Sequence, residues 1–264
     1  MSNKKSTPGG FSFMSAFIAI VVAVAIGILL YIFVLGAPGN FDAEGHPKAG
    51  SYLGMMYQGG LIVPILMSIV IIIIIFSIER LITISRAKGN GNVAEYVKKI
   101  QVFIAKKQFD EAIAASDKQQ GSLANVVRAG VQRLKQIQSE HGMDKEAKEA
   151  AIQKEIEEAT ALELPMLSKN LVVISTCATV ATLFGLIGTV LGMIRSFAAL
   201  SNAGAPDTTA LATGISEALI NTAIGIIGSV IGIIMYNYFS TRVDVITYSM
   251  DEAGYSIIQS VNAN

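Results

Sequence analysis

Four long apolar stretches dominate the sequence. They run from Phe13 to Leu35, Leu61 to Ile78, Leu171 to Ile194 and Leu211 to Phe239. Each is near or above the roughly 18 to 20 residues that a helix needs to cross the hydrocarbon core of a bilayer. Because a spanning segment must satisfy its own backbone hydrogen bonds in lipid, helices are favoured over strands. We expect an all-α polytopic membrane protein with four transmembrane helices.

Composition agrees with this class and excludes others. Apolar residues make up 52% of the chain and charged residues only 15%, against roughly 25% charged in an average soluble domain. The 20 basic and 20 acidic residues give a net charge of +0, so no global positive field exists to bind nucleic acid. The single cysteine, Cys177, lies in an apolar stretch and cannot form an internal disulfide.

The first apolar stretch could also be a secretory signal peptide, because Lys4 and Lys5 precede it. A signal peptide has an apolar region of only about 7 to 15 residues and a small-x-small cleavage site. This stretch is longer, and Val34-Leu35-Gly36-Ala37 offers no clear site of that kind. A retained membrane anchor is therefore favoured, whereas a cleaved signal would leave three spans.

The distribution of cations predicts the orientation, since cytoplasmic flanks collect lysine and arginine. Most of the 20 cations lie between Arg80 and Lys169, whereas residues 37–60 hold only Lys48 and residues 198–210 hold none. Arg195, at the other end of the third span, is the exception, and its side chain can reach the interface. We expect residues 80–169 and both termini to lie in the cytoplasm.

The expected organisation follows from the spans and the charges. It consists of a cytoplasmic N-terminus (1–12), a first span (13–36), a periplasmic loop (37–60), a second span (61–85), a cytoplasmic helical region (86–168), a third span (169–197), a second periplasmic loop (198–210), a fourth span (211–240) and a cytoplasmic C-terminal helix (241–264).

The cytoplasmic region is expected to be helical, with a last helix from Asp144 that runs past Pro165 into the third span. Apolar residues recur there at helical spacing between glutamates and lysines. No glycine-rich phosphate loop, catalytic constellation or paired metal motif is present. His46 and His141 fall on opposite sides of the membrane. We therefore expect no enzyme activity, no cofactor and no metal site.

The third and fourth spans each carry a stripe of small and hydroxylated residues. At about 100° per residue, Thr182, Gly185, Thr189 and Gly192 share one face of the third span. The fourth span has a similar stripe, and its one acid, Glu217, lies on a different face. The further members are Ser175, Ala178 and Ser196 on the third span and Ala218, Thr222, Gly225, Ser229 and Tyr236 on the fourth.

Two interpretations of these stripes remain open. Small residues allow close packing of membrane helices, which would account for the glycines. Hydroxyls and a carboxylate inside a membrane can instead line a hydrated proton route, because an intramembrane acid is costly unless it has a function. Glu217 favours a route, although an acid near a helix end can also reach the headgroups. The packing residues would be Gly185, Gly188, Gly192, Gly225, Gly228 and Gly232.

Three motifs in the last three spans have a distinctive order and spacing. The first is Gly59-Gly60 followed by Pro64 and ending in Ile78-Glu79-Arg80. The second is GLIGTVLGM at residues 185–193, and the third is GISEALINTAIG at residues 214–225. Together they resemble the motifs of the MotA/TolQ/ExbB proton-channel family, most closely those of its ExbB and TolQ branch. The first apolar stretch lies outside the three-span core of that branch and is an extra N-terminal helix, expected to pack outside the assembly that the family forms.

This resemblance implies a function. The chain would form a five-membered ring around two copies of a single-span partner of the ExbD or TolR type. A membrane aspartate of the partner would exchange protons, faced by Thr189 and Thr222, with Glu217, Thr182 and Ser229 along the route. Proton flow would drive an outer-membrane process through a periplasmic protein of the TonB type. A stator for the Tol system, gliding or flagellar motion is the alternative, and a helical membrane scaffold without proton conduction is the alternative of another class.

Overall fold

The computed structural model describes residues 13–48, 50–139, 144–201 and 207–262. Within them the regular structure is helical, without a β-strand, and four helices are long and apolar enough to cross a membrane. This confirms the predicted all-α polytopic class. Lys4, Lys5 and His141, on which parts of the sequence argument rest, lie outside the described residues.

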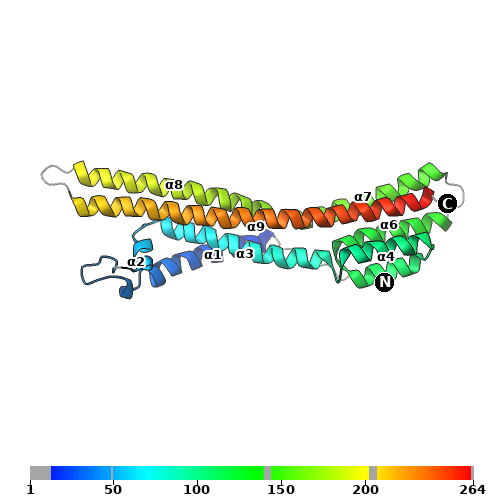
Figure 1. Ribbon diagram of the computed structural model, residues 1–264, viewed down its shortest axis with the longest axis horizontal. Coiled ribbons are helices and arrows are strands. Elements are labelled where there is room, and N and C mark those ends of the chain that lie inside the picture. Colours follow the sequence, from blue (N-terminus) through cyan, green and yellow to red (C-terminus); the bar gives the residue numbers. More distant parts are fainter. Residues whose placement is uncertain (1–12, 49, 140–143, 202–206, 263–264) are drawn as a thin grey trace. The chain divides into compact units, whose positions relative to one another are not determined.

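The helices follow one another closely along the chain (Figure 1). They are α1 (Phe13–Leu30), a π-helical turn (Tyr31–Leu35), a 3-10 turn (Pro38–Asn40), α2 (Tyr52–Tyr57), α3 (Ile62–Lys88), α4 (Val93–Ala105), α5 (Phe109–Gln119), α6 (Gly121–Ser139), α7 (Lys145–Ser168), α8 (Leu171–Ser201) and α9 (Thr208–Asn262). The chain divides into two compact units. We call Phe11–Ile78 with Asn170–Asn237 the membrane unit, and Glu79–Lys169 with Tyr238–Asn264 the helical unit.

The helical unit is built from the last part of α3, from α4 to α7 and from the last part of α9. Its helices α4, α5, α6 and α7 pack in succession. Each buries the apolar face that the spacing predicts, for example Ile100 on α4 and Ile152 on α7, both fully buried. The Gln101 Nε2 of α4 donates to the Ser256 Oγ of α9 at 3.0 Å. Burial of these apolar faces stabilises the unit, because periodic apolar stripes leave water together.

The helix before the third span does not run into it, so that expectation is wrong. Helix α7 continues through Pro165 and ends at Ser168, and α8 begins at Leu171. Between them Asn170 has a φ of 64°, in the left-handed region that a right-handed helix cannot include. Asn170 itself was the sequence signal for the break, because asparagine adopts the left-handed conformation more readily than most other residues do.

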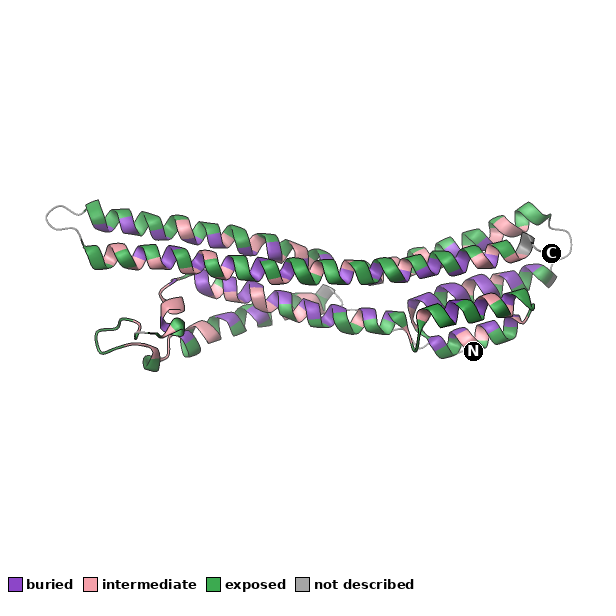
Figure 2. Cartoon of the chain, viewed as in Figure 1, coloured by how far each residue is buried: buried purple, intermediate pink, exposed green. Residues whose placement is uncertain are grey.

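Helix α1 meets α3 through a close contact in the membrane unit. A Cβ built on Gly27 would lie 2.3 Å from the Ser68 Oγ of α3, so only glycine allows this approach. Ala23 of α1 is fully buried, whereas most large apolar side chains of α1 are exposed, among them Phe17 and Leu29. The burial colouring shows the same exposed faces on α1, α8 and α9 (Figure 2). Exposed apolar faces of this kind are suited to lipid or to other helices.

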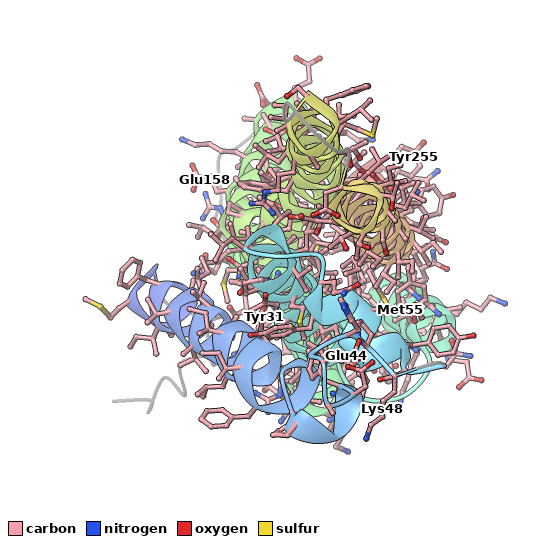
Figure 3. All side chains as sticks on the ribbon, turned by 90° about the vertical axis from the view of Figure 1, so that its left-hand side faces the viewer. Tyr31, Glu44, Lys48, Met55, Glu158 and Tyr255 are labelled. Carbon is pink, nitrogen blue, oxygen red and sulfur yellow. The ribbon has the colours of Figure 1, made fainter. Side chains whose placement is uncertain are left out.

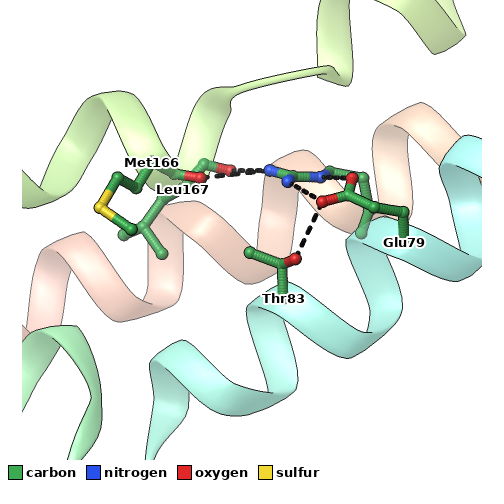
Figure 4. A network of polar contacts seen from close by, with 5 residues as sticks. Glu79, Thr83, Met166 and Leu167 are labelled. Atoms are coloured by element: carbon green, nitrogen blue, oxygen red, sulfur yellow. Dashed lines mark hydrogen bonds and ion pairs between the residues drawn. The ribbon is translucent and has the colours of Figure 1, made fainter. Parts of the chain in front are cut away.

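A buried ion pair holds α3 to α7 in the helical unit (Figure 4). The guanidinium of Arg80 is fully buried and donates to both carboxylate oxygens of Glu79, at 2.6 and 2.7 Å. Its remaining nitrogen donates to the carbonyls of Met166 and Leu167 at the end of α7, each at 3.2 Å. Thr83 donates to the same carboxylate at 3.0 Å. The motif Glu79-Arg80 is therefore a tie between two helices.

We predict that Glu79→Ala lowers the free energy of unfolding by about 3 to 5 kcal/mol, because it leaves the buried guanidinium without its carboxylate. Glu158→Ala is the matched control. It removes an exposed i,i+4 partner of Lys154 and should cost less than about 0.5 kcal/mol. The measurement is unfolding in detergent followed by circular dichroism, since the chain has no tryptophan. Equal losses in the two variants would contradict the structural role of the buried pair.

Candidate functional site: the α8–α9 contact

Helices α8 and α9 approach so closely that glycine backbones touch. A Cβ built on Gly225 would lie 2.9 Å from the Gly185 Cα, and one built on Gly188 would lie 2.4 Å from the Asn221 Cβ. On Gly192, a Cβ would meet the carbonyl of Gly214 at 2.6 Å. No larger residue fits these positions without a shift of backbone. The glycine stripe thus lies in the helix contact, as small residues in membrane helices allow.

The two remaining glycines singled out from the sequence also face a neighbouring helix. A Cβ on Gly228 would lie 2.9 Å from the Val70 Cγ2 of α3. On Gly232, it would lie 2.6 Å from the Ala178 Cβ of α8 and 3.2 Å from the Ile73 Cδ1 of α3. These glycines therefore let α9 pack against two helices, α3 and α8.

A pair of threonine hydroxyls bridges α8 and α9 within this contact. Thr189 Oγ1 and Thr222 Oγ1 are in direct hydrogen-bond contact, and both side chains are half-buried. The Thr189 hydroxyl also lies 3.4 Å from the carbonyl of Ala218, and the Thr222 hydroxyl 3.4 Å from the carbonyl of Gly185. Each hydroxyl can therefore switch its one proton between its partner threonine and a carbonyl. Such a pair can relay a proton without storing a charge.

Glu217 belongs to a second polar cluster, not to the threonine pair. Its side chain is buried, and both of its oxygens accept from Arg195 Nη1, one of them at 2.6 Å. Five residues at about 100° each separate the directions of Glu217 and Thr222 by roughly 140° around α9. The buried carboxylate is thus paired with a cation of α8, which offsets part of the free-energy cost of its burial.

Asn221 ties α9 to the turn before α3. It is fully buried, and its Nδ2 donates to the carbonyl of Gly59 at 2.9 Å. The next residue, Gly60, has a φ of 70°, and a Cβ there would lie 2.7 Å from a Glu217 oxygen. Glycine is required at this turn by both its backbone conformation and the closeness of the carboxylate. Glu217 and Asn221, one helical turn apart, therefore face the same turn.

The other predicted route residues lie apart from these clusters. Thr182 is exposed on α8, and Ser229 is buried on α9. The residues that sequence reasoning did not select are Arg195 and Asn221. The sequence did contain a signal for Arg195. It is the lone cation at the end of the third span, and Glu217, the lone acid of the fourth span, lies near the same side of the membrane. The helical period places Asn221 on the same helix face as Glu217, but the sequence does not indicate its partner.

The sequence pattern that defines the MotA/TolQ/ExbB proton channel family matches residues 118–252, which is more than half of the 264 residues. The chain belongs to this proton channel family. The match to the family contains α8 and most of α9, and with them both threonines, Arg195 and Glu217. Helices α1 to α4 precede it.

Individual members of the family show the same likeness. A Tol-Pal system protein TolQ of Pseudomonas aeruginosa is 31% identical over 121 residues, 46% of this chain and 52% of that protein. A TolQ of Haemophilus influenzae is 39% identical over 84 residues, 32% of this chain and 37% of that protein. A biopolymer transport protein ExbB of Aquifex aeolicus is 36% identical over 77 residues, 29% of this chain and 52% of that protein.

Both names occur among the relatives, which supports the ExbB and TolQ branch of the family. The chain spans about half the length of these relatives, or less.

We predict that Gly192→Ala destabilises the protein by about 1 to 3 kcal/mol, because the new methyl would overlap the backbone of α9. Helix propensity alone would favour alanine by about 1 kcal/mol, so the sign of the change isolates the contact. Gly39→Ala serves as control, since a Cβ there meets nothing within 4 Å, and it should stay within about 0.5 kcal/mol. Thermal unfolding in detergent measures both. Stabilisation by Gly192→Ala would contradict the close approach.

Proposed function

We propose that this chain is the ring subunit of an ExbB-type motor driven by the proton motive force, and that Thr189 and Thr222 face the proton route. The observation that carries the proposal is the hydroxyl pair, which joins α8 and α9 while both side chains remain partly exposed. A half-buried hydroxyl pair is open to a further helix or to water. Membership of a proton channel family supports the same assignment.

The threonines need an acid that takes up and releases the proton. Hydroxyls relay protons, but a carboxylate must carry the charge between the two sides. Glu217 is engaged by Arg195 and lies on another face of α9. A partner must therefore supply the exchanging acid, and a single-span protein of the ExbD or TolR type, in two copies, would place an aspartate beside the threonines. Glu217 then has a supporting role near the route.

The exposed faces of α8 and α9 favour a ring. Leu186, Val190 and Ile194 on α8 and Leu219 and Ile233 on α9 are each about half exposed or more. Faces this apolar on two adjacent helices are suited to contact with lipid and with further copies of the chain. Five copies would enclose the two partner helices in a ring lined by α8 and α9.

The distribution of cations supports an orientation in the bacterial inner membrane. The segment between Arg80 and Lys169, rich in lysine and arginine, would lie in the cytoplasm with both termini. Motion of the partner would then reach a periplasmic protein of the TonB type and energise outer-membrane transport. A stator of the Tol, gliding or flagellar type would use the same ring with another periplasmic target.

We expect Thr189→Val and Thr222→Val each to reduce proton uptake at least about tenfold, because valine keeps the shape and removes the relaying hydroxyl. The assay is dye-detected proton uptake into liposomes that contain the chain with the single-span protein encoded beside it. Thr179→Val is the matched control, since its hydroxyl bonds the carbonyl of Ser175 on its own helix. Normal uptake in both threonine variants, with the ring intact, would favour the scaffold alternative.

Native mass spectrometry of the detergent-extracted protein tests the assembly. We expect a mass of about five copies of the 28.0 kDa chain, and the addition of two partner chains on co-expression. These copy numbers are the ones that the family resemblance implies, and the exposed apolar faces of α8 and α9 offer surfaces for contacts with neighbouring copies and with a partner. A monomer, or an assembly that ignores the single-span protein, would overturn the ring.

A further inference from the structure

A cavity of about 700 Å³ lies at the end of the membrane unit that carries the Arg195–Glu217 pair. Figure 3 faces this end, with Tyr31 and the loop residues Glu44 and Lys48 labelled. The lining comes from several elements and includes Tyr31, Phe41, Tyr57, Arg195, Asp207 and Glu217. Cavities of roughly 300 to 1,000 Å³ are typical of sites for small molecules. Three charged residues, Arg195, Asp207 and Glu217, belong to this lining.

Arg195 presents an open edge to this cavity. Its Nη1 alone serves both oxygens of Glu217, and within the described part of the chain Nε and Nη2 make no hydrogen bond. The side chain of Arg195 is 54% exposed, against 6% for Glu217. The edge formed by Nε and Nη2 is the one with which a guanidinium binds a phosphate or carboxylate by two parallel hydrogen bonds.

The cavity also holds an acid that is not used by Arg195. Asp207 Oδ1 accepts from the backbone N–H groups of Thr209 and Ala210, at 3.0 and 2.9 Å, and so caps α9. Its carboxylate charge faces the same cavity as the arginine. With Glu217 paired with Arg195 Nη1, the cavity offers a hydrogen-bond donor edge that can bind an anion, and a separate negative charge on Asp207. A zwitterion complements this arrangement better than a simple anion does.

An aromatic cluster forms one wall of the cavity. The rings of Tyr31 and Tyr57 stack with centroids 4.6 Å apart, and Phe41 meets Tyr57 edge to face at 5.4 Å. The Tyr31 hydroxyl donates to the carbonyl of Tyr57 at 3.1 Å. Tyrosines are enriched where the hydrocarbon core meets the headgroups, because their rings are apolar and their hydroxyls polar. The wall is therefore suited to that depth.

The surrounding surface places the cavity at the edge of the hydrocarbon. Ile194, next to Arg195, is 59% exposed, and Phe197 and Leu219 are 61% and 66% exposed. Arg195 is the first charged residue after the apolar run of α8. The phosphodiester of a phospholipid lies at the same headgroup depth, within reach of the guanidinium.

We propose that this cavity binds the headgroup of a zwitterionic phospholipid that carries a primary ammonium. The phosphodiester takes the open edge of Arg195, and the ammonium lies beside Asp207. A bound headgroup would affect the position of the Glu217 side chain, because the phosphodiester and the carboxylate would both bond the guanidinium of Arg195. The proposal stands independently of the proton route.

Lipid titration of the full-length protein in detergent, read by native mass spectrometry, tests the site. The probe is phosphatidylethanolamine, compared with phosphatidylglycerol, which lacks the ammonium, and with inorganic phosphate. Arg195→Lys keeps a cation for the buried Glu217 but removes the second edge, and Asp207→Asn keeps the helix cap but removes the charge. Arg242→Gln is the control, since that guanidinium lies over the ring of Tyr238 in the helical unit.

We expect phosphatidylethanolamine to bind the unaltered chain and to bind Arg195→Lys and Asp207→Asn about tenfold more weakly, with Arg242→Gln unchanged. Circular dichroism melts verify that each variant is folded. Equal binding of phosphatidylglycerol would overturn the role of Asp207 and with it the zwitterion. Competition by inorganic phosphate at the same concentration would show a general anion site and overturn the proposal. Undiminished binding of phosphatidylethanolamine to both Arg195→Lys and Asp207→Asn would also overturn it.

Discussion

The close contact between α8 and α9 is the constraint on which the membrane unit depends. Lipid supplies no hydrophobic force to bring two apolar helices together, so they must gain from packing and hydrogen bonds. Glycines at the contact allow backbones to touch, and only at that distance does the hydroxyl of Thr189 reach the carbonyl of Ala218. The same approach seats Asn221 over Gly188. Packing and polar function, which were alternatives from the sequence, therefore share one surface.

Two buried acids of the chain are neutralised in different ways. Glu79 is paired with Arg80, whose guanidinium is fully buried and also bound by two carbonyls. Glu217 is paired with Arg195, whose guanidinium is half exposed and bonded through one nitrogen. The first arrangement is closed and has no free donor edge, as expected of a structural tie. The second is open toward a cavity, so its geometry can respond to an additional group.

The role of Glu217 shows where sequence reasoning stops. The helical period already directs Glu217 and Thr222 to different faces of α9, but it does not identify the partner of the carboxylate. Its partner lies on α8, 22 residues earlier in the chain. The sequence contains both charges, yet their pairing depends on the offset between two helices, which no local pattern encodes. The same holds for Asn221 and the carbonyl of Gly59, 162 residues apart.

Length, hydropathy and helical period were sufficient to predict the four membrane helices, the apolar faces of the helical unit and the small-residue stripes, because each depends only on neighbours along the chain. The motifs around Thr189 and Thr222 also predicted the family. The tertiary structure alone decided the break at Asn170, the pairing of Arg195 with Glu217 and the cavity beside them. These features depend on which helices meet and at what depth, and that follows from packing across the whole unit, not from any single segment.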